Sequence, residues 1–227
     1  MRVLLAGGGT GGHINPALAI ASIIQKHDPS AEFLFVGTPN GMEARLVPQA
    51  GYRLETMHVA GFQRKLTWKN IRRNVKAAYY LATSQHRAKQ ILKNFQPDIA
   101  IGTGGYVAGP ILHAAAHMGI PCAIHEQNAF PGVTNKMLAK EVDHVMLTVE
   151  KALDYLHPDC AYTVTGLPVR GSITHTDRAA ARRQLGFDDS MCILSFGGSL
   201  GAGCINEAMA KVIPWPVSYT HLTLPTT

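Results

Sequence analysis

The feature that most constrains this chain is a glycine-rich loop close to its start, Gly7-Gly8-Gly9-Thr10-Gly11-Gly12-His13. It follows an apolar run that predicts a strand over Arg2–Ala6, and it leads into a pattern that predicts a helix over Asn15–Lys26. A strand, a glycine loop and a helix N-terminus in that order bring free backbone N–H groups close to a ligand, which favours anions. The sequence therefore predicts a phosphate site near its N-terminus.

The same order of an apolar run, a polar junction and a helical pattern recurs along the chain. Further junctions stand at Gly102-Thr103-Gly104-Gly105-Tyr106, at His125-Glu126-Gln127-Asn128 and at Gly197–Ala202. This alternation predicts an α/β protein with a Rossmann-like, doubly wound, mostly parallel sheet. Because the carboxyl ends of parallel strands meet at one edge, we expect the junctions to line one crevice.

The sequence indicates a domain boundary near residue 166. Residues 1–165 complete one domain, and Gly166–Gly171 has the composition of a linker. The alternation then restarts with a predicted buried strand over Cys192–Phe196, a third glycine loop at Gly197–Ala202 and a helix from about Cys204. Residues 166–216 are thus interpreted as the linker and the first unit of an incomplete second Rossmann-like domain. Residues 217–227 continue no pattern, resemble a translated cloning adapter and are treated as a non-native tail.

Composition limits the class of protein. Hydrophobic residues make up 46% of the chain and charged residues 16%, which indicates a globular protein with a sizeable core. No apolar run reaches the roughly 18 residues of a membrane helix, and the apolar start is too short for a signal peptide. The four cysteines lack zinc-site and C-x-x-C spacing, so we expect buried thiols in a cytoplasmic protein.

The net charge of +6 is concentrated in residues 56–97, which contain no Asp or Glu. A solvated helix face, a nucleic-acid site and an anionic membrane surface are the three interpretations of such a segment. Basic residues flank an apolar helical face here, which favours a membrane surface over nucleic acid. The predicted membrane patch consists of Trp68, Lys69, Ile71, Arg72, Arg73, Val75, Lys76 and Tyr79.

The first loop also satisfies G-x-G-x-x-G, the pattern of dinucleotide sites. Such a site needs an acidic residue at the end of the second strand. Here Val36 is followed by Gly37-Thr38, and Glu32 lies at the opposite end of that strand. This argues against a nicotinamide or flavin cofactor, and a dinucleotide-dependent oxidoreductase is kept only as the alternative function.

Three residue types at the junctions suit chemistry. His13 stands at the helix mouth, where an imidazole can act as a general base or simply donate a hydrogen bond to a phosphate. His125 and Glu126 are neighbours at a strand end, so at most one should face the crevice. Asn128 can bind sugar hydroxyls. No acidic cluster suggests a metal site, so neither a metal nor a cofactor is predicted.

The motifs together resemble one family, the peptidoglycan N-acetylglucosaminyltransferases that convert lipid I to lipid II. The matching segments are Gly8-Gly9-Thr10-Gly11-Gly12-His13-x-x-Pro16-Ala17-Leu18, Gly102-x-Gly104-Gly105-Tyr106-x-x-Gly109-Pro110, His125-Glu126-Gln127-Asn128 with Pro131-Gly132-x-Thr134-Asn135, Gly166-x-Pro168-Val169-Arg170 and Gly197-Gly198-Ser199-x-Gly201-Ala202. The resemblance implies a GT-B fold, in which two Rossmann-like domains face each other across a cleft. It also implies a peripheral protein on the cytoplasmic face of the bacterial membrane.

The resemblance further implies roles for individual residues. The family's catalytic candidates match His13 and Glu126. Residues that contact the donor, UDP-N-acetylglucosamine, match Thr10, Gly11, Gly12, Asn128, Arg170 and Ser199. Gly104, Gly105 and Tyr106 match the loop that meets the diphosphate of the lipid I acceptor. The basic, apolar helix matches the surface that docks on anionic membranes.

Two departures from the family pattern stand out. Leu200 occupies a position where the family usually has Gln, and the chain lacks most of the second domain. We therefore expect little or no activity from this chain alone. A lone acceptor-binding domain that docks on membranes is the non-catalytic hypothesis.

Overall fold

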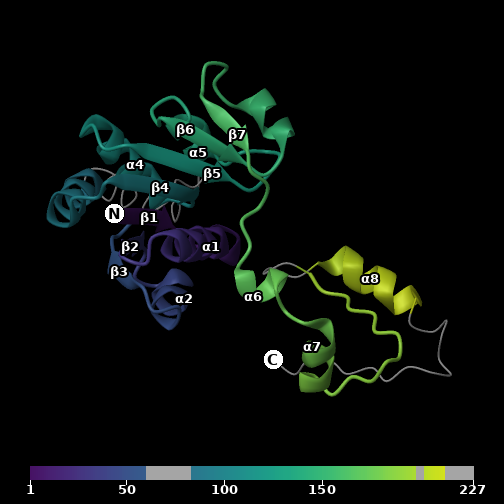
Figure 1. Cartoon of the computed structure of the whole chain (residues 1–227). Coiled ribbons are helices and arrows are strands. Elements are labelled where there is room, and N and C mark those ends of the chain that lie inside the picture. The colour runs from purple at the N-terminus through teal and green to yellow at the C-terminus, as the bar shows by residue number, and fades with distance from the viewer. Residues whose placement is uncertain (60–82, 198–201, 213–227) are drawn as a thin grey trace. The chain divides into compact units, whose positions relative to one another are not determined.

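The computed structural model describes residues 1–59, 83–197 and 202–212 (Figure 1). The chain divides into two compact units, Met1–Thr176 and Asp177–Thr227, which we describe separately. This division falls beyond the domain boundary that the sequence predicts near residue 166.

The first unit is built on a sheet of seven parallel strands in the order β3-β2-β1-β4-β5-β6-β7. The strands are β1 (Arg2–Gly7), β2 (Glu32–Gly37), β3 (Arg53–Thr56), β4 (Ile99–Gly104), β5 (Cys122–Glu126), β6 (His144–Leu147) and β7 (Tyr162–Val164). The predicted Rossmann-like parallel sheet is confirmed. The strand order reverses between β1 and β4, so this pair marks the switch point at which such sheets bind ligands.

Helices cover both faces of the sheet (Figure 1). They are α1 (Gly11–His27), α2 (Glu43–Gln49), α4 (Ala108–His117), α5 (Val133–Leu138), the 3-10 helix η1 (Glu150–Tyr155) and the helical residues 83–95. A further short helix, α6 (Gly171–Thr174), follows β7 in the chain, and none of its described side chains belongs to the core. Alternate residues of β1 point to opposite faces. Val3 and Leu5 pack with α1 and α2, whereas Leu4 and Ala6 pack with α4, α5 and residues 83–95. Burial on both faces explains why Val3–Ala6, the centre of β1, is apolar without interruption.

The first helix begins earlier than the sequence predicts. Thr10 takes the N-cap position in an extended conformation, and its carbonyl accepts hydrogen bonds from the N–H groups of His13 and Ile14. Both glycines of the loop's second half, Gly11 and Gly12, therefore lie in the first turn of α1. The helix thus presents its N-terminus directly at the switch point.

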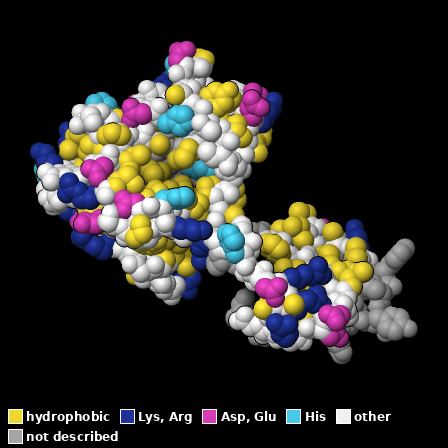
Figure 2. Space-filling model, in the orientation of Figure 1, with side chains coloured by type: hydrophobic (Ala, Val, Ile, Leu, Met, Phe, Trp, Pro, Cys, Tyr) yellow, Lys and Arg dark blue, Asp and Glu magenta, His cyan; other side chains and the backbone are white. Residues whose placement is uncertain are grey.

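The second unit contains α7 (Arg178–Gln184) and α8 (Gly203–Val212). Asp177 caps α7 by accepting a hydrogen bond of 2.7 Å from the Ala180 N–H. The predicted buried strand over Cys192–Phe196 is wrong: the segment is not a strand, and Leu194 is 78% exposed. Figure 2 accordingly shows hydrophobic side chains on the surface of this unit. A strand forms only against a partner, and none of the described residues of this unit supplies one.

Three predicted features fall outside the described residues. They are the membrane patch between Trp68 and Tyr79, Ser199 in the third glycine loop, and the non-native tail of residues 217–227. None of the helices that the structure describes is long and apolar enough to span a membrane.

Candidate functional site

The loops that follow β1 and β4 meet at the switch point. A Cβ atom placed on Gly105 would overlap the Gly8 carbonyl, and one on Gly104 would lie 2.6 Å from Nδ1 of His13. Both Gly104 and Gly105 have positive φ angles, +106° and +82°, which disfavour any other residue. Glycine at these two positions therefore lets the two loops touch.

The start of α1 is open to a ligand. A Cβ on Gly11 or Gly12 would meet no described atom closer than 3.5 Å, so packing does not require glycine there. The first turn of α1 contains no acidic side chain, and the Thr10 side chain does not cap it. Free N–H groups and the positive end of the helix dipole make this turn suited to a phosphate.

His13 is anchored between these loops. Its Nδ1 lies 3.0 Å from the Thr103 carbonyl oxygen, and the Thr103 hydroxyl donates to the His13 carbonyl at 2.8 Å. A carbonyl oxygen only accepts hydrogen bonds, so Nδ1 carries the proton of the neutral ring. This leaves Nε2 with a free lone pair, which is the form that a general base needs.

Gln127 connects His13 to a buried histidine. Its Oε1 lies 3.2 Å from Nδ1 of His13, and its Nε2 donates to Nδ1 of His125 at 3.0 Å. His125 in turn donates from Nε2 to the Gly166 carbonyl at 3.0 Å. Burial lowers the pKa of His125, against smaller opposing effects of the Gly166 carbonyl and Glu126, so the ring stays neutral and can accept from Gln127. The sequence did not single out Gln127.

Glu126 is buried and its carboxylate is fully engaged. It accepts hydrogen bonds from the backbone and side chain of Asn128, from the Gly132 N–H and from the Asn135 side chain, at 2.8, 3.1, 3.1 and 2.9 Å respectively. Only 2% of Glu126 is exposed. The carboxylate thus shapes the loop that carries the exposed Asn128, and neither Glu126 nor His125 faces solvent.

A second buried carboxylate, Glu43, was not anticipated from the sequence. It accepts hydrogen bonds from the Gly9 N–H at 3.0 Å and from the backbone and hydroxyl of Thr38 at 2.7 and 2.6 Å. Burial by itself raises the pKa of this carboxyl, but the hydrogen bonds from Thr38 and Gly9 outweigh it, so the pKa lies below its usual value. The only sequence signal was an acidic residue in the first turn of α2.

The remaining predicted site residues are placed as follows. Tyr106 follows Gly105 and is 64% exposed. Arg170 is exposed and takes the N-cap position of α6 in the same unit. Glu32 is exposed at the start of β2, and the carboxylate of Glu43 is already bound to Thr38 and Gly9. Neither acid is therefore placed to bind the ribose of a dinucleotide.

These features define a Rossmann-like α/β domain with a positioned histidine at a helix N-terminus whose free N–H groups suit an anion. The sequence profile of the glycosyltransferase family 28 N-terminal domain matches residues 3–147, and the chain belongs to that family.

The chain is similar to several curated proteins and solved structures. It is 45% identical over 214 residues to a UDP-N-acetylglucosamine–N-acetylmuramyl-(pentapeptide) pyrophosphoryl-undecaprenol N-acetylglucosamine transferase of Acetivibrio thermocellus, covering 94% of this chain and 57% of that protein. The protein of the same name from Caldanaerobacter subterraneus is 46% identical, with 94% and 58% covered. The crystal structure of Acinetobacter baumannii MurG is 31% identical, with a TM-score of 0.60, and 76% of this chain and 47% of that one are covered.

A more distant structure shares the fold alone. The UDP-GlcNAc 2-epimerase of Neisseria meningitidis, solved with UDP-GlcNAc, has a TM-score of 0.52 at 14% identity, covering 95% of this chain and 55% of that one. The chain spans somewhat more than half the length of the curated relatives that it matches.

Proposed function

We propose that this chain forms the acceptor-side part of an enzyme that transfers N-acetylglucosamine from UDP-N-acetylglucosamine to lipid I, the undecaprenyl-diphosphate-linked muramoyl pentapeptide, to give lipid II. The observation that carries the proposal is His13, held with Nε2 free between two glycine loops at the mouth of α1. The similarity to transferases of that name supports the choice of substrates.

In the proposed reaction, Nε2 of His13 takes the proton from the 4-hydroxyl of the muramoyl unit. The hydroxyl oxygen attacks the anomeric carbon of N-acetylglucosamine, the bond to UDP breaks with inversion, and the diphosphate leaves with its electron pair. Charge on departing phosphates is stabilised by helix N-termini and backbone N–H groups, as at Gly11 and Gly12.

We assign the two ligands to different loops. Thr10, Gly11, Gly12, Asn128, Arg170 and Ser199 are proposed to bind the donor. Gly104, Gly105 and Tyr106 are proposed to meet the diphosphate of the acceptor, since Gly105 touches the first loop at Gly8 and Tyr106 is exposed beside it.

Of the two catalytic candidates, we assign the base to His13. The carboxylate of Glu126 accepts four hydrogen bonds inside its own loop, whereas Nε2 of His13 is free to accept a proton. Glu126 is therefore proposed as a positioning residue that holds Asn128 at the crevice.

We further propose that the protein works at the cytoplasmic face of the membrane as a peripheral protein. The support is the basic, acid-free sequence of residues 56–97, in which cationic residues flank an apolar face at helical spacing. An anionic membrane surface and the lipid I embedded in it are the expected partners.

The test adds to this chain the part of its longer relatives that it does not span. The full chain is joined to the C-terminal domain of the Acetivibrio thermocellus relative, and transfer of labelled sugar to a lipid I analogue is measured. We expect turnover by the joined enzyme and a loss in kcat of about 100-fold or more in His13→Ala, as for removal of a general base. His144→Ala, which removes a ring bonded to the Thr163 hydroxyl, is the matched control.

Binding of the lipid I analogue to the unjoined chain provides a second measurement. A joined enzyme that transfers no sugar, together with a chain that binds no acceptor, would contradict the proposed function. Near-normal kcat in His13→Ala would contradict the assignment of the base only.

A further inference from the structure

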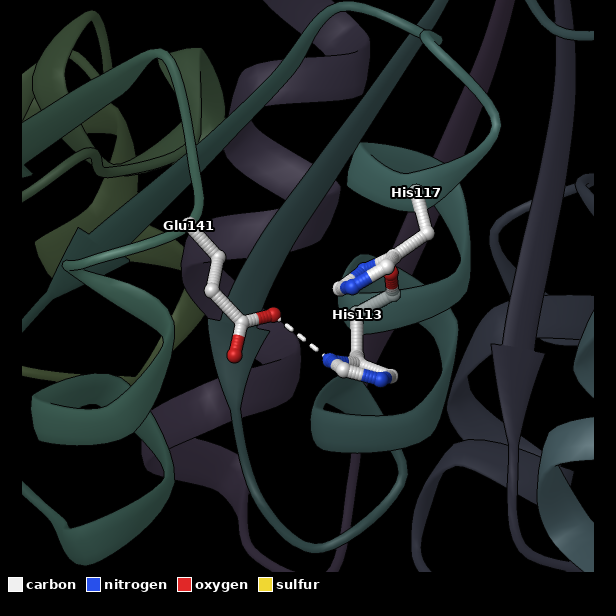
Figure 3. Close-up of side chains that lie close together, drawn as sticks. All are labelled: His113, His117 and Glu141. Carbon is white, nitrogen blue, oxygen red and sulfur yellow. Dashed lines mark hydrogen bonds and ion pairs between the residues drawn. The ribbon is translucent and has the colours of Figure 1, made fainter.

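Two imidazoles and a carboxylate lie together away from the candidate active site (Figure 3). They belong to His113 and His117 on α4 and to Glu141, shortly after the end of α5. The possible metal-ligating atoms of the three side chains all lie within 4.8 Å of one another. Nδ1 of His113 is 2.6 Å from Oε2 of Glu141.

The sequence and fold bring these groups together. Residues four apart on a helix share a face, and the rings of His113 and His117 are accordingly 4.2 Å apart between centroids. Glu141 is fixed by a turn in which its N–H donates to the Leu138 carbonyl at 2.8 Å. Figure 3 shows its side chain reaching across towards His113.

The protonation of His117 also suits a metal ligand. Its Nδ1 lies 2.9 Å from the His113 carbonyl oxygen, so Nδ1 donates and Nε2 keeps a lone pair. Histidines that bind metals commonly donate their other ring N–H to a carbonyl in this way, which fixes the tautomer and orients the ring.

We propose that His113, His117 and Glu141 form a binding site for a divalent transition-metal ion of the Zn²⁺ type. Imidazole nitrogens with one carboxylate suit Zn²⁺, Ni²⁺ and Cu²⁺, whereas Mg²⁺ and Ca²⁺ prefer oxygen ligands. With metal–ligand distances near 2.1 Å, two tetrahedral ligands lie about 3.4 Å apart. The 2.6 Å contact between Glu141 and His113 therefore has to lengthen, and the widest separation among the three ligand atoms, up to 4.8 Å, has to shorten, each by about an ångström through side-chain rotation. Water fills the fourth position.

An ion at this site would stabilise the fold and would take no part in catalysis. Helix α4 begins just after the Gly104–Tyr106 loop and runs back across the sheet, so His113 and His117 lie towards its far end. An ion held there cross-links α4 to the end of α5, and α5 carries the Asn135 that binds Glu126. The inference does not depend on the proposed transferase activity.

The experiment measures Zn²⁺ binding to the full chain by isothermal titration calorimetry. Cys192 and Cys204 are exposed thiols, so both are first replaced by Ser to remove competing ligands. We expect saturable binding of one Zn²⁺ per chain, release of protons on binding, a higher Tm with Zn²⁺ that a chelator reverses, and no effect of Mg²⁺.

Variants then locate the ion. His117→Ala and Glu141→Gln should each weaken Zn²⁺ binding by tenfold or more, while circular dichroism shows an unchanged fold. His86→Ala, which removes another exposed helical histidine, should leave binding unchanged. The proposal is overturned if the parent chain binds no Zn²⁺, if Mg²⁺ binds equally well, or if His117→Ala and Glu141→Gln both bind as tightly as the parent.

Discussion

The loops after β1 and β5 are each held by hydrogen bonds to one buried carboxylate, but the two carboxylates differ in how far along the sequence they lie from the residues that they bind. Glu43 comes from α2 and binds Gly9, which lies 34 residues earlier in the chain. Glu126 is the last residue of β5 and binds residues that follow it within the next nine positions. The first loop is therefore shaped by tertiary packing and the second by its own sequence.

This difference predicts different consequences when each loop is disturbed. Loss of Glu43 should loosen the first loop while the strands around it stay paired. Loss of Glu126 should release both the Asn128 loop and α5, because Asn135 lies on that helix. Gln127 joins the two regions, since it contacts His13 on one side and His125 on the other.

The largest effect is expected for Glu126→Ala. It leaves four N–H donors without their acceptor, and we expect the free energy of unfolding to fall by about 4 kcal/mol, measured by urea denaturation. Glu32→Ala, at an exposed position of β2, should change it by less than about 0.5 kcal/mol. Similar small losses in both variants would contradict the role given to Glu126.

A smaller effect is expected for Glu43→Gln. The amide keeps one acceptor oxygen but loses the charge that strengthens the bonds from Thr38 and Gly9, so we expect a loss of about 2 kcal/mol. Hydrogen exchange should speed up at the Gly9 and Thr38 amides more than in the strands. Uniform acceleration across β1 and β2 would show that Glu43 supports the whole sheet instead of one loop.

Lowering the pH should reduce the difference in the free energy of unfolding between Glu43→Gln and the unsubstituted chain. The pKa of Glu43 is lowered in the folded state from a usual value of 4.5, so its stabilising effect is complete above that pH and is lost as the pH falls through the folded pKa. Other groups, such as His125, titrate in both proteins, so only the difference in unfolding free energy reports on Glu43. A difference that stays constant from pH 7 down to pH 3 would contradict this.

Gln127→Ala tests the connection between the two loops. His13 keeps its hydrogen bond to Thr103, so we expect stability to fall by only about 1 kcal/mol. In the joined enzyme described above, kcat should fall about tenfold because the ring of His13 is less well positioned. The effects of Gln127→Ala and His13→Ala on kcat should not add, and fully additive losses would show that the two residues act independently.

The sequence predicted the architecture because β1, β2 and β4 are short apolar runs that end in glycine and alternate with helical patterns, which is typical of a parallel α/β sheet. It failed for Cys192–Phe196, which has the same pattern as Val3–Ala6. Val3–Ala6 is fully buried between β2 and β4, whereas Leu194 is 78% exposed. An apolar pattern shows that a segment is able to form a buried strand, but the segment forms one only where neighbouring strands pair with it.

The site was predictable only in part for the same reason. Gly104, Gly105 and Glu126 stand at strand ends and His13 stands at the start of the helix that follows β1, where position alone makes a residue a candidate. Glu43 and Gln127 act through contacts made by tertiary packing, at separations of 34 and 114 residues, and no local spacing reveals them. The tautomer of His13 also could not be predicted from the sequence, because it is the contact with the Thr103 carbonyl that fixes which ring nitrogen carries the proton.

The smallest effect on stability is expected within the first loop itself, for Gly12→Ala. A Cβ on Gly12 meets no described atom closer than 3.6 Å, so the free energy of unfolding should change by less than about 0.5 kcal/mol. In contrast, a Cβ on Gly8 overlaps the Glu43 carboxylate, and Gly8→Ala should cost about 2 kcal/mol. Gly12→Ala should instead raise KM for UDP-N-acetylglucosamine in the joined enzyme, because the methyl group occupies space beside the free N–H groups. If Gly12→Ala changes neither KM nor stability, the open turn of α1 does not bind the donor. Glycine would still be required at position 8, because a Cβ there would overlap the Glu43 carboxylate whether or not a ligand binds.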